Sequence, residues 1–104
     1  MAFTSNEFKK LANIVNDCMK YGIGDNFPKL KNILSLMKTN DDWQNLIMAY
    51  GMKSNYLYGL PLGKPKNLID NLRYNLKSNE NGYFSKELND IRKDMESKKI
   101  TFKI

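Results

Sequence analysis

Histidine is absent from the sequence, and this absence narrows the chemistry that the chain can perform. Histidine is the commonest general base near neutral pH, the usual partner of a serine or cysteine nucleophile, and a frequent zinc ligand. The single cysteine, Cys18, lies on an apolar stripe with Val15 and Met19, so we expect it in the core and not in an exposed, reactive setting. We therefore predict a protein without enzymatic activity and without a cofactor.

Long hydrophobic runs and pairs of cysteines are missing as well. The longest apolar stretch, residues 46–50, is far shorter than the roughly 20 residues that cross a bilayer. The first residues lack the basic start and the apolar core of a secretory signal. One cysteine cannot form an internal disulfide, which fits a reducing compartment. We therefore expect neither secretion nor a membrane as partner.

Arginine is scarce in a chain that is otherwise basic. Lysine outnumbers arginine 15 to 2, and the formal net charge is +6. Such a charge attracts nucleic acid, because neutralised phosphates release counterions. Nucleic-acid interfaces favour arginine, however, and a bias in composition also produces a lysine-rich chain. Nucleic acid is therefore kept as an alternative partner.

Apolar residues recur at helical spacing in five segments, and hydrophobic residues make up 41% of the chain, which is ordinary for a globular domain. A chain of 104 residues holds one core. The expected inward-facing residues are Phe8, Leu11, Ala12, Val15, Cys18, Met19, Phe27, Leu30, Ile33, Leu34, Met37, Trp43, Leu46, Ile47, Tyr50, Leu68, Ile69, Leu72, Leu76, Phe84, Leu88, Ile91 and Met95. We predict an all-α fold, a single compact domain over residues 1–104 with Trp43 as a core anchor.

Capping residues indicate where the helices begin. Thr4 and Glu7 have the spacing of a capping box. Pro28 suits the first turn of a second helix, where its missing amide hydrogen costs least, and Thr39 precedes a third. We expect the first helix over about residues 5–20, the third to end at Gly51 and the fifth to begin near Gly82.

Two segments carry large apolar residues outside the helical pattern. Residues 52–65 hold two glycines and two prolines, which predicts a long loop or arm between the third and fourth helices. Residues 100–104 alternate apolar and polar side chains, which predicts an extended C-terminal tail. With no helical face to hide these side chains, they either cover the core or meet a partner. The candidate partner-binding residues are Tyr56, Tyr58, Leu60, Leu62, Ile100, Phe102 and Ile104.

Several short motifs occur in a recognisable order: the segment 20–25, Lys-Tyr-Gly-Ile-Gly-Asp, follows the first helix, Asp42-Trp43 and Ala49-Tyr50 lie in the third, and Gly82 opens the last. This order resembles a single annexin-type repeat, a right-handed five-helix unit. The resemblance covers nearly the whole chain apart from an insertion around residues 52–65. It implies a compact five-helix annexin-repeat-like domain with a long loop between helices three and four.

The inserted arm and the terminal Ile-Thr-Phe-Lys-Ile are similar to features of annexin-like modules in virion proteins of bacteriophages that infect Bacteroidetes. That resemblance implies a small structural or assembly protein, located in a virion or in the host cytoplasm. Its partners would be other virion proteins or copies of itself. Two alternatives are a basic nucleic-acid-binding or host-defence-inhibiting phage protein and a calcium-dependent membrane-binding module.

The calcium site that the resemblance implies is incomplete in this chain. In annexins, a Lys-Gly-x-Gly-Thr loop offers carbonyl oxygens to calcium, and a downstream acidic residue completes the site. Here Tyr21 intrudes, the threonine is absent, and Asn75 stands at the acidic position. Calcium requires about six to eight oxygen ligands. We therefore expect no metal site, with Gly22, Gly24 and Asp25 as weak candidates only.

Overall fold

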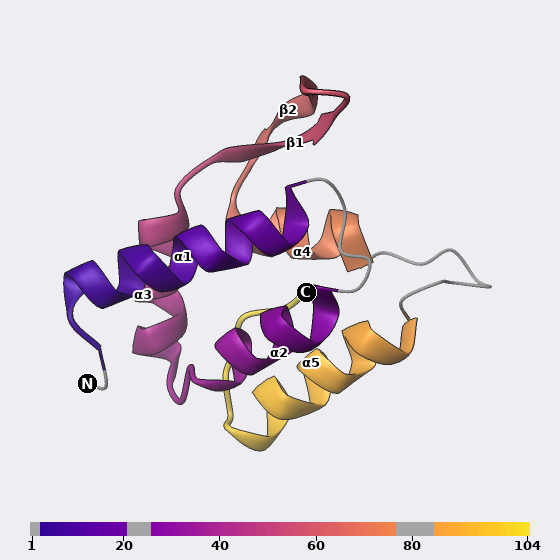
Figure 1. The fold of residues 1–104 in the computed structure, drawn as a ribbon. Helices are drawn as coiled ribbons and strands as arrows, with labels where there is room; N and C mark the ends of the chain where they lie inside the picture. The colour runs from indigo at the N-terminus through magenta and orange to yellow at the C-terminus, as the bar shows by residue number, and fades with distance from the viewer. Residues whose placement is uncertain (1–2, 21–25, 77–84) are drawn as a thin grey trace.

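The computed structural model describes residues 3–20, 26–76 and 85–104. These parts form five helices and a two-stranded sheet (Figure 1). In chain order the elements are α1 (Ser5–Met19), α2 (Phe27–Ser35), α3 (Asn40–Tyr50), β1 (Lys53–Leu57), β2 (Leu60–Lys66), α4 (Leu68–Leu76) and α5 (Ser85–Ser97).

The predicted helix starts at Thr4 and Thr39 are confirmed by their hydrogen bonds, Pro28 lies in the first turn of α2 as expected, and the start expected near Gly82 lies outside the described residues. The Thr4 hydroxyl accepts from the Glu7 amide at 3.2 Å, and the Glu7 carboxylate accepts from the Thr4 amide at 2.8 Å, which completes the capping box. At α3, the Thr39 hydroxyl accepts from the Asp42 amide at 3.1 Å. Gly51 ends α3 with a φ of 68°, a backbone angle that favours glycine.

One core lies between the helices. It contains Trp43, which is fully buried as predicted, and Cys18, whose buried thiol is free. Burial raises the pKa of Cys18, which disfavours the thiolate, the reactive form of this side chain. α1 lies across the molecule, packed against α3 and α2, and α2 lies beside α5 (Figure 1). The core therefore places the end of α1 next to the segment that follows α3.

The predicted all-α class is wrong, because residues 53–66 form an antiparallel hairpin of β1 and β2 and not an irregular loop. Tyr58 and Gly59 make its two-residue turn, with φ values of 51° and 80°. Two positive φ values define the type I′ turn, whose twist matches that of paired strands. The strands pair Leu57 with Leu60 and Tyr56 with Pro61, and a bulge interrupts the register between Lys53 and Asn55.

Prolines are normally excluded from strands, and this is why the sequence indicated a loop. In a two-stranded sheet, however, each strand pairs along one edge only. The amide groups on its other edge point away from the partner strand and donate no hydrogen bond to it. The pair beside a two-residue turn exchanges hydrogen bonds and the next pair does not, so Pro61 opposite Tyr56 occupies a position that needs no amide hydrogen. The outward direction of the Tyr56 amide agrees with this, because it donates to the Lys20 carbonyl at 2.8 Å.

Candidate interaction surface

The root of the hairpin is fixed by one buried side chain, that of Asn71 on α4. Its Nδ2 lies 3.0 Å from the Lys53 carbonyl and 3.2 Å from the Lys66 carbonyl, which belong to paired residues at the base of the two strands. Asn75, one turn later, donates to the Asn55 side chain at 3.3 Å and to the Asn71 carbonyl at 2.8 Å. α4 therefore holds both strands of the hairpin where they leave the helical body.

A tyrosine hydroxyl links this anchor to two other helices. Tyr50 on α3 accepts from Asn71 Nδ2 at 2.9 Å and lies 3.5 Å from the Asn16 Oδ1 on α1, to which it donates. Burial raises the pKa of Tyr50 to about 12, and the Asn71 hydrogen bond opposes that rise in pKa. The hydroxyl stays neutral at physiological pH and can both donate and accept. The position of the hairpin is thereby tied to α1, α3 and α4.

The end of the hairpin lies away from the helices (Figure 1). The Tyr58 side chain is 94% exposed, Leu60 is 70% exposed and Leu62 is 41% exposed. Tyr56 differs from these three, because it is half-buried and its ring lies 5.0 Å from the Lys20 ammonium. We call Tyr58, Leu60 and Leu62 the hairpin tip. Of the four arm residues predicted to bind a partner, these three are exposed.

The turn at the tip is conformationally strained. Tyr58 has a φ of 51°, in the left-handed region that a bulky side chain rarely adopts. Asparagine or glycine at this position forms the type I′ turn with less strain. A residue that adopts such a conformation is often found where a side chain serves a function other than stability. The aromatic side chain at position 58 is therefore not explained by the turn itself.

The predicted tail residues lie elsewhere and face inward. Ile100 and Ile104 are only 4% and 6% exposed, and Phe102 is half-buried against the core. Residues 100–104 fold back over the helices, so the apolar side chains of the tail cover the core of this chain. The tail forms no strand.

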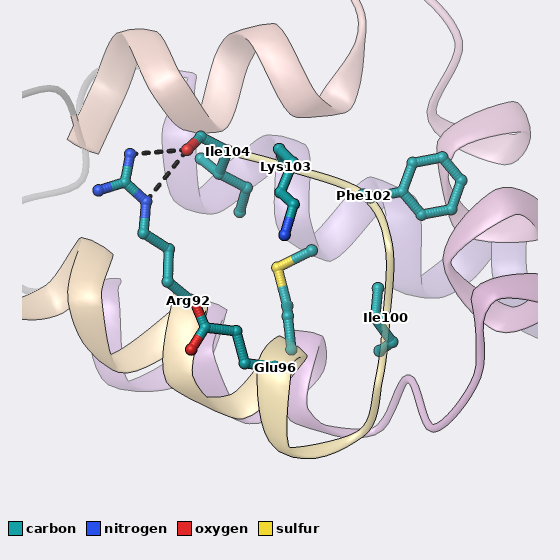
Figure 2. A pocket seen from close by; sticks show the side chains of 7 residues that line it. Arg92, Glu96, Ile100, Phe102, Lys103 and Ile104 are labelled. Carbon is teal, nitrogen blue, oxygen red and sulfur yellow. Dashed lines mark hydrogen bonds between the residues drawn. The ribbon is translucent and has the colours of Figure 1, made fainter.

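Arginine side chains hold the tail in place. Figure 2 shows Arg92 reaching from α5 to Ile104, whose main-chain oxygen accepts from Nε at 3.0 Å and from Nη2 at 2.6 Å. Arg73 on α4 donates to the Lys103 carbonyl at 3.2 Å. These are the two arginines of the chain. A hollow of about 210 Å³ lies between the tail and α5, lined by Arg92, Met95, Glu96, Ile100, Phe102, Lys103 and Ile104.

The weak metal candidates Gly22, Gly24 and Asp25 lie outside the described residues. Within residues 3–20, 26–76 and 85–104, no three acidic or cysteine side chains cluster as metal ligands would. Asn75, at the acidic position of the annexin-type pattern, serves the hairpin root instead. In the same described parts of the chain, no helix is long and apolar enough to span a membrane.

The role of Asn71 was not predicted from the sequence. The signal was present, since Asn71 follows Leu68 by three residues and precedes Leu72 on the inward stripe of α4. A polar residue at a buried helical position requires hydrogen-bond partners. The pattern indicates that such a residue has partners, but it does not indicate which segment supplies them.

Comparisons with family models, with curated proteins and with solved structures found no match to this chain.

Proposed function

We propose that the protein is a non-enzymatic binding module that presents the hairpin tip to a protein partner. The observation that carries the proposal is the exposure of Tyr58, Leu60 and Leu62 on a hairpin whose root is fixed by Asn71. Aromatic and large aliphatic side chains are the groups that fill pockets at the centre of protein interfaces. A fixed root lowers the entropy that is lost when such a segment is ordered by binding.

The partner is expected to recognise side chains and not the strand edges. Pro61 and Pro65 remove two amide donors from β2, and the Tyr56 amide on β1 is already bonded to Lys20. Prolines on an edge strand disfavour the addition of another strand. Side chains at the tip are therefore the groups that remain for specific contact.

The resemblance to annexin-like modules supplies the proposed setting. On that ground the partners would be other virion proteins or further copies of this chain. The proposal of a hairpin-mediated contact rests on exposure and geometry and does not depend on that setting.

The test compares two double variants of the tagged chain, purified from the cell in which it is produced. Tyr58→Asn with Leu60→Thr removes the two most exposed side chains of the hairpin tip, and the resulting Asn-Gly pair favours the type I′ turn. Leu36→Gln with Met48→Gln removes apolar side chains that are 40% and 67% exposed on the helical body. We expect proteins that co-purify with the wild type to be lost from the tip variant, at least about tenfold, and retained by the control.

Circular dichroism and thermal melts of both variants check that the fold is intact. Equal recovery of the same proteins by the tip variant and the wild type would contradict the proposal. The contact should also survive about 0.5 M salt, because apolar burial is not screened.

A nucleic-acid partner is the second candidate, favoured by the charge of the hairpin. Residues 51–67 contain Lys53, Lys64 and Lys66 and no acidic residue. Binding through these lysines would weaken linearly in a plot of log affinity against log salt, with a slope set by the phosphates neutralised. If nuclease treatment or about 0.5 M salt abolishes the recovery of molecules that co-purify with the chain, the nucleic-acid candidate is favoured over a protein partner.

A further inference from the structure

An aromatic ring and several charged side chains lie together where β2 leads into α4. Lys66 ends β2, and Asp70, Arg73 and Tyr74 lie on α4. These four residues line a shallow hollow of about 290 Å³, and we call them the Tyr74 surface. Tyr74 is 45% exposed, so a large part of an aromatic side chain reaches solvent at this surface.

Contacts place both cations of the Tyr74 surface. The Lys66 Nζ lies 4.6 Å from the centre of the Tyr74 ring, an attractive cation–π distance, and donates to the Lys64 carbonyl at 3.3 Å. The Arg73 Nη1 lies 3.2 Å from the Asp70 carboxylate, and its Nη2 donates to a carbonyl of the tail at 3.2 Å. These bonds use only part of the N–H donors that an ammonium and a guanidinium group carry. Both cations are therefore held in position and keep donors for a ligand.

The charge around the Tyr74 surface favours a polyanion. The sequence has no aspartate or glutamate between Asp42 and Asp70, whereas residues 53–66 contain three lysines. Among the described residues that line the hollow, Asp70 is the only acid, and Arg73 pairs with it. That ion pair offsets the repulsion between Asp70 and an anion, so the lysines determine the sign of the local potential.

The exposed ring indicates which class of polyanion fits. An acidic peptide would pair with the cations but has no planar group to place on the ring. In single-stranded nucleic acid, an unpaired base stacks on an aromatic side chain while the phosphates meet lysine and arginine. A base inside a duplex is already stacked on its neighbours and cannot do this. Tyr74 beside Lys66 and Arg73 supplies the two kinds of group that this recognition requires.

We infer that the Tyr74 surface binds single-stranded nucleic acid, with one base stacked on the exposed part of the Tyr74 ring and the adjoining phosphates paired with Lys66 and Arg73. The inference goes beyond the protein contact at the hairpin tip and does not rest on it. It adds to the nucleic-acid candidate a site on α4 and a preference for an unpaired strand.

Fluorescence anisotropy of the full chain with a labelled oligonucleotide of about ten deoxythymidines measures the binding. We expect saturable binding at about 50 mM salt, where phosphate contacts are strong. The matched control is an abasic strand of the same length, which keeps every phosphate and lacks the bases. We expect it to bind at least about fivefold more weakly, as for the loss of one stacked base. No saturable binding, or equal affinity for the abasic strand, would overturn the inference.

Two variants of Tyr74 test the stacked base. Tyr74→Ala removes the ring and should weaken oligonucleotide binding at least about fivefold, whereas Tyr74→Phe keeps the ring and should bind like the wild type. Circular dichroism checks that both variants remain helical. Equal affinity of Tyr74→Ala and the wild type would contradict the stacking. A loss in Tyr74→Ala that is as large for a duplex of the same length would overturn the assignment to an unpaired strand.

Lys66→Gln tests the phosphate contact through the salt dependence of binding. For single strands, the slope of log affinity against log salt is about −0.7 for each phosphate that is neutralised. We expect this slope to become shallower by about 0.7 in Lys66→Gln and to stay unchanged in Lys93→Gln, which removes an exposed lysine of α5. Equal slopes in Lys66→Gln and the wild type would show that Lys66 meets no phosphate and would overturn the proposed site.

Two further arms separate this inference from other readings. Polyglutamate that competes for the same surface as tightly as the oligonucleotide would replace the nucleic-acid assignment by an acidic peptide. The tip variant Tyr58→Asn with Leu60→Thr should bind the oligonucleotide like the wild type, and a loss there would overturn the placement on α4. Unchanged recovery of partner proteins by the tip variant contradicts the hairpin-tip proposal whatever the oligonucleotide result, so the two failures are distinguishable.

Discussion

At the scale of single residues, Asn71 fixes the position of the hairpin relative to the helices. The two hydrogens of its Nδ2 are shared among two strand carbonyls and the Tyr50 hydroxyl, and each full hydrogen bond contributes about 1 kcal/mol. Among the described residues, the buried Asn71 Oδ1 and Asn55 Nδ2 have no hydrogen-bond partner, and each costs about 1–3 kcal/mol. The free energy gained from these hydrogen bonds is similar in size to the free energy lost at the two atoms without a partner. The network therefore specifies position more than it adds stability.

The Tyr50 hydroxyl gives this network a dependence on pH. Its pKa is raised from 10.0 to about 12 in the folded protein, so the neutral form stabilises the fold fully below pH 10. That contribution is lost as the pH rises from about 10 to about 12, because the unfolded state loses its proton first. We expect the free energy of unfolding to fall by up to about 2 kcal/mol across this window.

Urea titrations between pH 8 and pH 12 measure this effect, with Tyr50→Phe as control. Lysines and exposed tyrosines titrate in both proteins, so the difference between the two isolates Tyr50. A difference that stays constant with pH would show that the hydroxyl is not held in the buried network described above.

At the scale of elements, the helices were predictable and the hairpin was not. Thr4, Thr39 and Gly51 each act within one or two turns, so local spacing identifies them. The hairpin depends on Asn71 and Lys20, which are distant in sequence from the strands that they hold. Local signals around Pro61 therefore predicted a loop.

The tail and the hairpin tip show that local sequence patterns also could not distinguish buried from exposed residues in the candidate site. Alternation in residues 100–104 indicated that one side is apolar, but not that Ile100 and Ile104 meet the core of this same chain. Tyr58 and Leu60 have the same kind of pattern and are exposed. One difference between the two segments is that Arg73 and Arg92 bond the tail and not the hairpin.

The tail supplies a prediction at this scale. Arg92→Lys keeps the charge and loses the two-donor geometry that bonds the Ile104 oxygen. We expect the stability to fall by about 1 kcal/mol and the backbone order parameters of residues 101–104 to decrease toward about 0.6. Denaturant titration and nitrogen-15 relaxation measure the two quantities. Lys93→Gln is the control on the same helix, and order parameters equal in all three proteins would show that Arg92 does not hold the tail.

At the scale of the whole molecule, a compact body carries the projecting hairpin. The radius of gyration of 13.1 Å matches the roughly 13 Å of a globular domain of about 100 residues. Charge is unevenly placed on this body. The acidic residues Asp90 and Asp94 of α5 are paired with lysines, whereas the lysines of residues 53–66 have no acidic neighbour within their own segment. A partner that is acidic around an apolar pocket would complement the hairpin.

The central claim is that the hairpin tip is where the partner binds, and photo-crosslinking tests it most directly. A photoreactive phenylalanine analogue is placed at position 58, and separately at positions 36 and 48, where the native residues are also exposed. Each tagged chain is irradiated in the cell that produces it, and adducts are identified by mass spectrometry. The account predicts one discrete protein adduct from position 58 and none of comparable yield from positions 36 and 48. A discrete adduct from position 36 or 48, with none from position 58, would contradict it.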